Sequence, residues 1–439
     1  MSPPPAANAA IDAAPDAAAT VAPTGLSGYQ KFIVAVIAFL QFTIILDFMV
    51  LSPLGALIMP ALNVTPGQFG LLVSTYAFSA GLSGLLAAGF TDRFDRKRVL
   101  LFFYTGFVLG TLLCALASSY HFLLFARMIT GVFGGVIGST LLAITTDLFE
   151  YRVRGRVMGV VQTAFAASNV LGIPLALLLS NRWGWNAPFL LIVAASLIVG
   201  IVIVMKMQPV RAHLQRSPDR NALHHFLHTV SRPRYLQGFA TTGFLTVGGF
   251  MLMPFMSNFT VHNMGIPLER LPLVYMVTGI ASMIAGPLIG RASDAIGKFP
   301  VFACGCAITI LMVTIYTHLG MTPLAVVILV SVALFIGVSS RMISSAALIS
   351  AVPSPSDRGS YMAISSSIQQ FAGGIAATIA GLIVTQRADG TIEHFEVVGY
   401  LLTVTTLTSL AMMYLIQRRI EPRAARPLTV AAPETPVAP

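Results

Sequence analysis

Charged residues are scarce in this chain of 439 residues. Only 10% of the residues are Asp, Glu, Lys or Arg, whereas 56% are hydrophobic and the mean hydropathy is +0.82. A soluble globular domain carries about 25% charged residues, so the composition excludes that class. Apolar runs of about 20 residues can cross the hydrocarbon core of a bilayer as helices. The sequence therefore predicts an all-α integral membrane protein.

Cysteines and the signatures of catalysis are also scarce. The three cysteines, Cys114, Cys304 and Cys306, lie in apolar segments, where a free thiol behaves as a small hydrophobic side chain. They suggest neither a disulfide framework nor a metal site. The chain has no nucleotide-binding Gly loop, no Walker sequence and no nucleophile motif. We therefore expect no enzyme, no cofactor, no metal and no ATP-driven pump.

Twelve apolar runs follow one another along the chain. Their expected bounds are 32–55, 69–90, 98–118, 122–146, 158–180, 187–205, 236–258, 271–290, 299–318, 324–351, 360–385 and 396–417. The first residues are rich in Ala and Pro and lack a basic segment before an apolar core, so they are not a cleavable signal peptide. We expect disordered tails at 1–30 and 419–439. Two six-helix bundles are expected at 31–205 and 236–418, joined by a linker at 206–235.

The basic residues are distributed unevenly between the two sides of the predicted membrane. Lys and Arg favour the cytoplasmic side of short loops. If both termini are cytoplasmic, only Arg182, Arg270 and Arg387 fall in loops of the other side, while Arg127 and Arg341 fall within spans. The remaining Lys and Arg residues share the cytoplasmic side, which explains the net charge of +10 without nucleic-acid binding.

Two loops of the first half have counterparts in the second half. AGFTDRFDRKRV at 88–99 is similar to GRASDAIGKFPV at 290–301, an offset of 202 residues. RGRVM at 154–158 is similar to RGSYM at 358–362, an offset of 204. Because both pairs occupy equivalent places, they indicate an internal repeat. A repeat of this kind places a binding site between the halves, near the middle of the membrane.

The same loops resemble the major facilitator superfamily. Residues 88–97 are similar to that family's Gly-x-Leu-Ala-Asp-Arg-x-Gly-Arg-Lys loop, with Ala88 and Asp95 in place of its two glycines. ARMITGVFGG at 126–135 resembles the family's Arg-x-x-x-Gly segment, and GWNAPF at 184–189 resembles a stretch common in bacterial drug:proton antiporters. The resemblance covers nearly the whole chain outside the tails.

The fifth span resembles a signature of proton-coupled exporters of that family, Gly-x8-Gly-x3-Gly-Pro. Here Gly159, Ser168 and Gly172 occupy the positions of small residues, and Pro174 follows one residue late. The resemblance thus implies a monomeric transporter of the bacterial inner membrane that exports a small drug or metabolite against proton entry. A second interpretation is an importer or facilitator of an organic anion. A non-transporting sensor or scaffold would need neither the repeat nor a buried acid.

Asp47 and Arg127 are charged residues within predicted spans. A charge at the bilayer centre costs about 2.5–3.5 kcal/mol, so each needs a cavity or a partner. Asp47 lies roughly 12 Å and Arg127 roughly 8 Å from the outer ends of their helices, at 1.5 Å per residue. The resemblance makes these two helices neighbours, so an ion pair is within reach. Two interpretations remain open: proton coupling by separation of the pair, or a permanent pair that fixes packing. Thr43, Asp47, Leu51 and Leu54 share one helix face, which we expect to turn to a cavity.

Arg341 lies within the tenth span, and no acidic residue of its own helix is near it. Either its side chain extends to the inner surface, or it lines the cavity and meets an anionic group. With Arg127, it is a candidate receptor if the substrate is an organic anion. Other candidates for the substrate cavity are polar, aromatic or Met side chains at middle depth, namely Gln162, Asn169, Gln369, Gln370, Tyr76, Phe165, Met253, Phe255 and Tyr275.

The basic loops give candidates for a gate on the cytoplasmic side. The resemblance implies that Asp92 faces the start of the eleventh span, near Gly359, where a helix dipole favours an anion. Arg96 is then expected to pair with Asp147 or Glu150. The remaining members of this candidate gate are Arg93 and the residues of the second copy, Asp294 and Lys298. Fixing the topology by positive charge alone is the competing interpretation.

Overall fold

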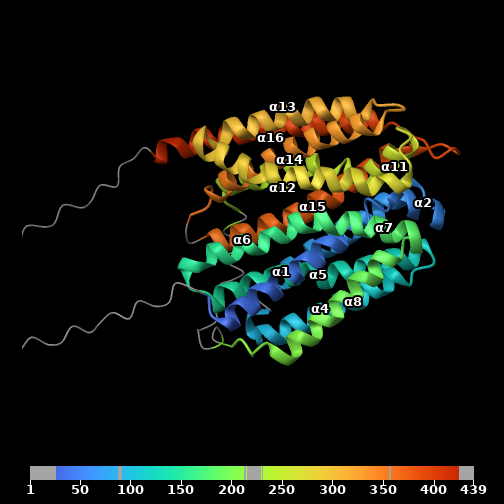
Figure 1. The fold of residues 1–439 in the computed structure, drawn as a ribbon. Coiled ribbons are helices and arrows are strands. Elements are labelled where there is room, and N and C mark those ends of the chain that lie inside the picture. Colours follow the sequence, from blue (N-terminus) through green and yellow to red (C-terminus); the bar gives the residue numbers. More distant parts are fainter. Residues whose placement is uncertain are drawn as a thin grey trace, which may run out of the picture.

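Helices make up nearly all of the residues that the computed structural model describes, which are 26–87, 91–211, 214, 229, 231–354 and 357–424. The first half of the chain forms the lower part of Figure 1 and the second half the upper part. The first half contains α1 (Gly28–Val50), α2 (Gly55–Leu62), α3 (Pro66–Ala87), the 3-10 turn η1 (Thr91–Arg93), α4 (Arg96–Ala115), α5 (Tyr120–Leu148), α6 (Tyr151–Ala167), the π-helical turn η2 (Ser168–Gly172), α7 (Ile173–Trp183) and α8 (Ala187–Lys206). The second half contains α10 (Pro233–Phe250), α11 (Met253–His262), the 3-10 turn η4 (Leu268–Arg270), α12 (Leu271–Ala295), α13 (Lys298–Thr317), α14 (Leu324–Ser350), α15 (Arg358–Ile383) and α16 (Phe395–Ala424). Strands β1 (Thr385–Gln386) and β2 (Ile392–Glu393) pair antiparallel before α16.

Each of the twelve expected spans corresponds to a helix or to a series of helices. Ten described segments are long and apolar enough to cross a membrane. The fifth span is α6, η2 and α7 in succession, and the eleventh is α15. The expected all-α membrane fold is therefore confirmed. The predicted tails and the middle of the predicted linker lie mostly outside the described residues, and α1 starts at Gly28, just before the expected bundle.

Proline interrupts the first span of each half. α1 ends at Val50, short of the expected 55, because Pro53 has no N–H and disfavours helical geometry in the residue before it. After a turn, α2 starts at Gly55. In the second half α10 ends at Phe250, and α11 starts with Pro254 among its first residues. Both halves thus bend their first helix at equivalent places, which extends the repeat to local distortions.

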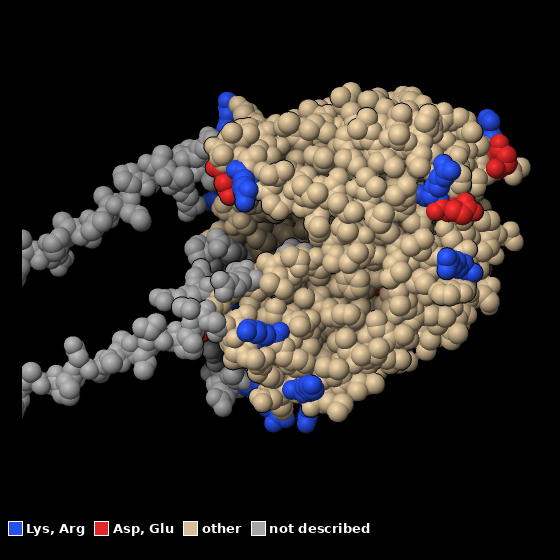
Figure 2. Space-filling view, viewed as in Figure 1, with Lys and Arg blue, Asp and Glu red and all other residues tan. Residues whose placement is uncertain are grey.

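The two ends of the molecule carry most of the charge, and a belt between them carries almost none (Figure 2). α1 starts and α16 ends at the left of Figure 1, which we call the basic end; the opposite end, with β1 and β2, we call the hairpin end. Between them the surface exposes large apolar side chains such as Leu109, Leu197 and Val404. An apolar belt between two polar ends is the surface expected of a protein that spans a bilayer.

The two halves contact each other mainly through α3 with α15 and through α7 with α12. Gly70 lets the backbones of α3 and α15 approach, since a Cβ there would lie 2.6 Å from the carbonyl oxygen of Ala377. Ser74 donates a hydrogen bond across this contact to the carbonyl of Gly374 at 2.8 Å. At the basic end Figure 2 shows a hollow between the halves.

At the hairpin end the halves are joined by hydrogen bonds and close packing. Ser257 of α11 donates to the carbonyl of Ser52 at 3.1 Å, and Asn258 contacts the sulfur of Met59 at 3.1 Å. Asn181 of α7 donates to the carbonyl of Leu268 at 3.1 Å. The halves are therefore tied together at the hairpin end and parted at the basic end.

Candidate functional site

A buried ion pair joins α1 to α5. Nη1 of Arg127 lies 2.9 Å from Oδ2 of Asp47 and also donates to the carbonyl oxygen of Asp47 at 3.2 Å. Both side chains have no exposed surface. Thr111 of α4 donates to the other carboxylate oxygen at 3.2 Å. Side chains of two other helices therefore converge on this carboxylate, and the structure brings together the two residues that depth and the family resemblance paired.

The guanidinium of Arg127 also lies over the ring of Tyr76 from α3, 4.6 Å from its centre. Such a contact is attractive because the ring face is electron-rich. Nε and Nη2 of Arg127 have no hydrogen-bond partner among the described residues. The cation is thus balanced by one carboxylate and one ring, and part of its donor capacity is unused. Removing either partner of a buried ion pair strongly destabilises the folded protein, because the other charge is left buried and unpaired.

Two glycines on α5 make this arrangement possible. A Cβ at Gly131 would lie 2.5 Å from the carbonyl oxygen of Tyr76, and one at Gly135 would lie 2.3 Å from that of Ala80. Only glycine lets α5 approach α3 this closely at both positions. The four-residue spacing of the two glycines places them on one helix face. This face keeps Arg127 within reach of Tyr76.

The face of α1 that carries Asp47 turns into the first bundle, which corrects the expected orientation toward a cavity. Thr43 and Leu51 on that face are as buried as Asp47. The adjacent face of α1, with Phe48 and Met49, borders the interface between the halves instead. Inside the bundle the carboxylate reaches Arg127 and Thr111, whereas a position on the interface would leave it without them.

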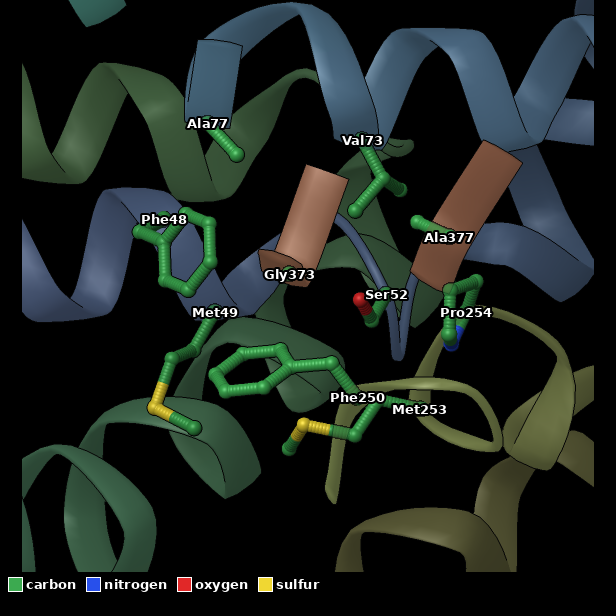
Figure 3. A pocket seen from close by; sticks show the side chains of 10 residues that line it. All are labelled: Phe48, Met49, Ser52, Val73, Ala77, Phe250, Met253, Pro254, Gly373 and Ala377. Carbon is green, nitrogen blue, oxygen red and sulfur yellow. The ribbon is translucent and has the colours of Figure 1, made fainter. Parts of the chain in front are cut away.

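A small apolar pocket lies between the halves, close to the ion pair (Figure 3). Phe48 of α1 and Phe250 of α10 lie opposite each other, with ring centres 5.9 Å apart. The ring of Phe48 also packs 5.3 Å from that of Tyr76, which lies over Arg127. The pocket is lined by Phe48, Met49, Ser52, Val73, Ala77, Phe250, Met253, Pro254, Gly373 and Ala377. One aromatic layer thus separates the pocket from the ion pair.

Most of the predicted cavity residues lie elsewhere. Of the aromatic and Met candidates whose side chains are described, only Met253 lines this pocket. Phe255 is buried against Phe69, and Tyr76 is buried beneath Phe48. Asn169 lies in η2 beside Gly279 of α12. The predictions missed Phe48 and Phe250 because helix rotation decides which side of a span meets the interface.

The glutamine candidates and Phe165 differ in whether the structure describes their side chains. Gln370 lies on α15 with its Cβ beside Gly81 of α3, whereas Gln369 is exposed. The side chains of Gln162 and Phe165 lie outside the described residues. Neither of the two described glutamines lines the pocket.

Arg341 is a second buried cation, on α14, and only 1% of its surface is exposed. Its Nε, Nη1 and Nη2 have no hydrogen-bond partner among the described residues. The guanidinium lies beside Gly248 of α10, since a Cβ on that glycine would be 3.3 Å from Nη2. The side chain does not extend to the basic end, because side chains tilt toward the start of their helix and α14 starts at the hairpin end.

A second pocket lies inside the second bundle, between α11, α12, α13 and α14. Tyr275, a predicted cavity residue, lines this pocket rather than the interface. Its lining also holds the hydroxyls of Thr278 and Ser331, which are buried and have no partner among the described residues. Thr260 and Tyr316 pair their hydroxyls at 2.6 Å. The pocket is therefore uncharged, with several hydroxyl groups in a mainly apolar lining.

Acidic residues hold the start and the end of the linker at the basic end. Asp95 caps α4 through the amide of Lys97 at 2.9 Å, and it accepts from the amide of Val210 at 3.1 Å and from Nε of Arg211 at 2.9 Å. Partial burial opposes its ionisation, but these hydrogen bonds prevail and lower the pKa of Asp95 below its ordinary value. In the second half Asp357 accepts from Tyr235 at 2.7 Å and pairs with Arg232 at 3.1 Å.

The candidate gate residues fall into separate groups. Nε of Arg96 lies 3.1 Å from Oδ2 of Asp147, which is one of its two expected partners. The side chains of Arg96 and Asp147 are both largely buried. Glu150 and Arg93 are exposed. Oδ1 of Asp294 on α12 lies 3.6 Å from Nζ of Lys298 at the start of α13, and both side chains are exposed. The side chain of Asp92 lies outside the described residues, so its expected contact near Gly359 does too.

Comparison with protein families and relatives agrees with this architecture. The family model of the Major Facilitator Superfamily matches residues 37–344 and 239–439. An uncharacterized transporter of that type from Bacillus subtilis, YceJ, is 24% identical over 369 residues, which cover 83% of this chain and 93% of that protein. A probable sugar efflux transporter from Mannheimia succiniciproducens is 23% identical over 265 residues, which cover 60% of this chain and 65% of that protein.

Solved structures share the fold. A bacterial homolog of the human lysosomal transporter Spinster, in an inward-facing and occupied conformation, superposes with a TM-score of 0.72 at 16% identity. The match covers 90% of this chain and 98% of that one. The nucleoside transporter NupG, solved as a point mutant, gives a TM-score of 0.70 at 14% identity, and the match covers 88% of this chain and 99% of that one. At these identities the likeness establishes the fold alone.

Proposed function

This chain belongs to the major facilitator superfamily, and on that premise we propose that it exports a small organic compound in exchange for protons. Membership makes it a multi-pass membrane transporter. The direction of transport, the coupling to protons and the substrate are the proposal. They rest on the buried Asp47–Arg127 pair and on the pocket beside it.

The ion pair is the observation that carries the proposal. A cation 2.9 Å away favours the ionised form of a carboxylate inside the membrane, and withdrawal of that cation favours the neutral form. Separation of α1 from α5 would therefore let Asp47 take up a proton, and renewed approach would release it. The unused donors of Arg127 can meanwhile bind other acceptors. Proton binding and the arrangement of the helices are thereby linked.

The pocket supplies the second half of an exchange cycle. Its lining is apolar and includes Met49 and Met253, whose flexible side chains adapt to ligands of different shape. Phe48 borders the pocket and packs on Tyr76, which lies over Arg127. A ligand that displaces Phe48 would thus disturb the cation–ring contact. The contacts from Phe48 through Tyr76 to Arg127 would therefore connect the substrate pocket with the proton-binding pair.

We infer that the basic end faces the cytoplasm of a bacterial cell and that the structure corresponds to an inward-open conformation. The basic residues at that end follow the distribution found in cytoplasmic loops. The contacts at the hairpin end close the outer side, and the hollow opens toward the basic end. A cysteine introduced in the β1–β2 turn should react with an impermeant thiol reagent added to intact cells, and one near Arg211 should not. The reverse pattern would refute this orientation.

Uptake of an organic anion is the alternative that a specific observation favours. Arg341 is buried without an acid, so an anionic substrate would find a cation in the second bundle. The two functions differ in coupling. Export against protons requires a pH gradient, whereas facilitated uptake follows the anion gradient alone.

Reconstituted vesicles can test the proposal. With the wild-type protein, an imposed pH gradient should drive transport of at least one member of a panel of cationic, neutral and anionic compounds. Asp47→Asn should reduce gradient-driven transport to the level of empty vesicles. The matched control is Asp389→Asn, which removes an exposed acid in the β1–β2 turn. Intact gradient-driven transport by Asp47→Asn would reject proton coupling through this residue.

A further inference from the structure

Arg341 is a buried cation without a counter-charge among the described residues, and the transport cycle proposed above does not use it. Only 1% of its surface is exposed, and none of its three nitrogens has a hydrogen-bond partner in the described part of the chain. The thiol of Cys306 on α13, a weak acceptor, lies near the guanidinium. A guanidinium stays charged in proteins, so loss of a proton cannot relieve this site.

The sequence supplies no acid to neutralise Arg341. From α10 to the end of α16, the acidic residues are Glu269, Asp294, Asp357, Asp389, Glu393, Glu396 and Glu421. All of them lie in loops or near helix ends. In the first half, the acid deep within a span is Asp47, which already meets Arg127. The counter-charge of Arg341 must therefore come from outside the chain.

The surroundings of the guanidinium offer a further donor. The Cβ position of Gly248 lies 2.9 Å from Oγ1 of Thr405 on α16, a hydroxyl that donates to the carbonyl of Leu402. The same Cβ position also lies 3.3 Å from Nη2 of Arg341 and 3.5 Å from Oγ1 of Thr406. This hydroxyl is buried and has no partner among the described residues, and the same holds for Ser344, one turn along α14 from Arg341. Glycine at 248 keeps a side chain out of the space between the cation and the hydroxyl.

We propose that Arg341 and Thr406 form a binding site for one small monovalent anion inside the second bundle. The guanidinium supplies one positive charge, and both the guanidinium and the hydroxyl can donate hydrogen bonds. A halide or a carboxylate accepts such bonds and carries one negative charge. Two sources supply this chemistry: an inorganic ion such as chloride, or the carboxylate of a transported compound. The site does not depend on proton coupling, so it stands or falls separately from the proposed export.

Anion-dependent stability of the purified full-length protein tests the site. Melting temperatures are measured in detergent while chloride or acetate replaces a bulky organic sulfonate at constant sodium. A ligand that binds only the folded protein raises its melting temperature. We expect wild type to gain about 2–5 °C at saturating anion. Arg341→Met should lose this gain, and Arg291→Met, which removes an exposed Arg, should keep it.

The two arms distinguish the sources. A rise with chloride but not with acetate supports an inorganic ion, and a rise with acetate alone supports a substrate carboxylate. If Arg341→Met does not fold, Thr406→Val takes its place and should weaken the response several-fold. Equal shifts in wild type and in the variant, or no anion-specific shift in wild type, would overturn the proposal.

Discussion

In the first half of the molecule Asp47 and Arg127 neutralise each other, whereas in the second half Arg341 faces a glycine and a hydroxyl. The repeat makes the comparison direct. The offset of 202 places Thr278 at the position of Tyr76, and the offset of 204 places Ser331 at that of Arg127. Both hydroxyl residues line the uncharged pocket of the second bundle.

The two bundles thus share helices and bends but not electrostatics. Where the first bundle holds a titratable acid with its cation, the second holds an uncharged pocket. The cation of the second bundle lies further along α14, toward the basic end. A repeat of two equal halves would supply two proton sites. The difference is why we propose proton coupling for the first half and anion binding for the second.

The largest expected effect separates the two buried cations. Asp47→Leu leaves Arg127 charged, buried and unpaired, so we expect a loss of about 3–5 kcal/mol in the free energy of unfolding. Arg341→Met removes a cation that already lacks a partner, and we expect unchanged or increased stability in the absence of a small anion. Denaturation of both variants in detergent measures the contrast. Equal losses would show that the two sites do not differ in this way.

Helix packing gives a second contrast. Gly135→Val would place atoms against the carbonyl of Ala80, so we expect it to cost about 3 kcal/mol and to displace α5 from α3. The offset of 204 places Ser339 at the equivalent position of α14, where the side chain is only partly buried. Ser339→Val should change stability by less than about 0.5 kcal/mol. Melting temperatures of both variants provide the measurement. A large loss in Ser339→Val would indicate equally tight packing in both halves.

Hydroxyl groups provide a finer comparison between the bundles. Thr111 donates to the carboxylate of Asp47, and Thr111→Val should cost about 1.5–3 kcal/mol because the bond is to a charged group. Ser331 has no partner among the described residues, so Ser331→Ala should be nearly neutral. Unfolding of both variants under the same conditions tests the difference. If Ser331→Ala were the more harmful change, the second pocket would contain an interaction that the described residues do not supply.

The spans follow from hydropathy alone. The Asp47–Arg127 contact follows from matching depths at the helical rise together with the family resemblance, which makes the two helices neighbours. The sequence did not predict which face of α1 meets the interface. A helix that is apolar on all sides carries no signal of its rotation, so Phe48 and Phe250 were missed while Phe255 was chosen wrongly. That rotation depends on tertiary contacts such as those of Gly131, which pattern alone does not reveal.

Asp95 takes the place of a glycine in the family's loop, and the sequence analysis did not identify it as the N-cap of α4. An Asp directly before a helix start is a common N-cap, and this signal was present before Arg96. Its contact with Arg211 was out of reach of the sequence, because the two residues lie in separate loops. In the same way, Asp357 and Arg232 come together only in the fold.

The smallest expected effect concerns the basic end, where the halves agree. Asp95 holds the start of the linker through Val210 and Arg211, and Asp357 holds its end through Arg232. Because the pKa of Asp95 is lowered by folding, its contact contributes stability above the ordinary value of 3.8 and is lost as the pH falls through the lower folded-state pKa.

Asp95→Ala should therefore cost about 1 kcal/mol at neutral pH and speed hydrogen exchange at the amide of Val210, since that amide loses its acceptor. Asp357→Ala should leave Val210 protected, because its contacts lie in the second half. The cost of Asp95→Ala should also shrink in acid below the folded-state pKa, where the wild-type carboxyl is protonated. A cost that is independent of pH would mean that the cap acts without its charge, and the two ends of the linker would then be held by different forces.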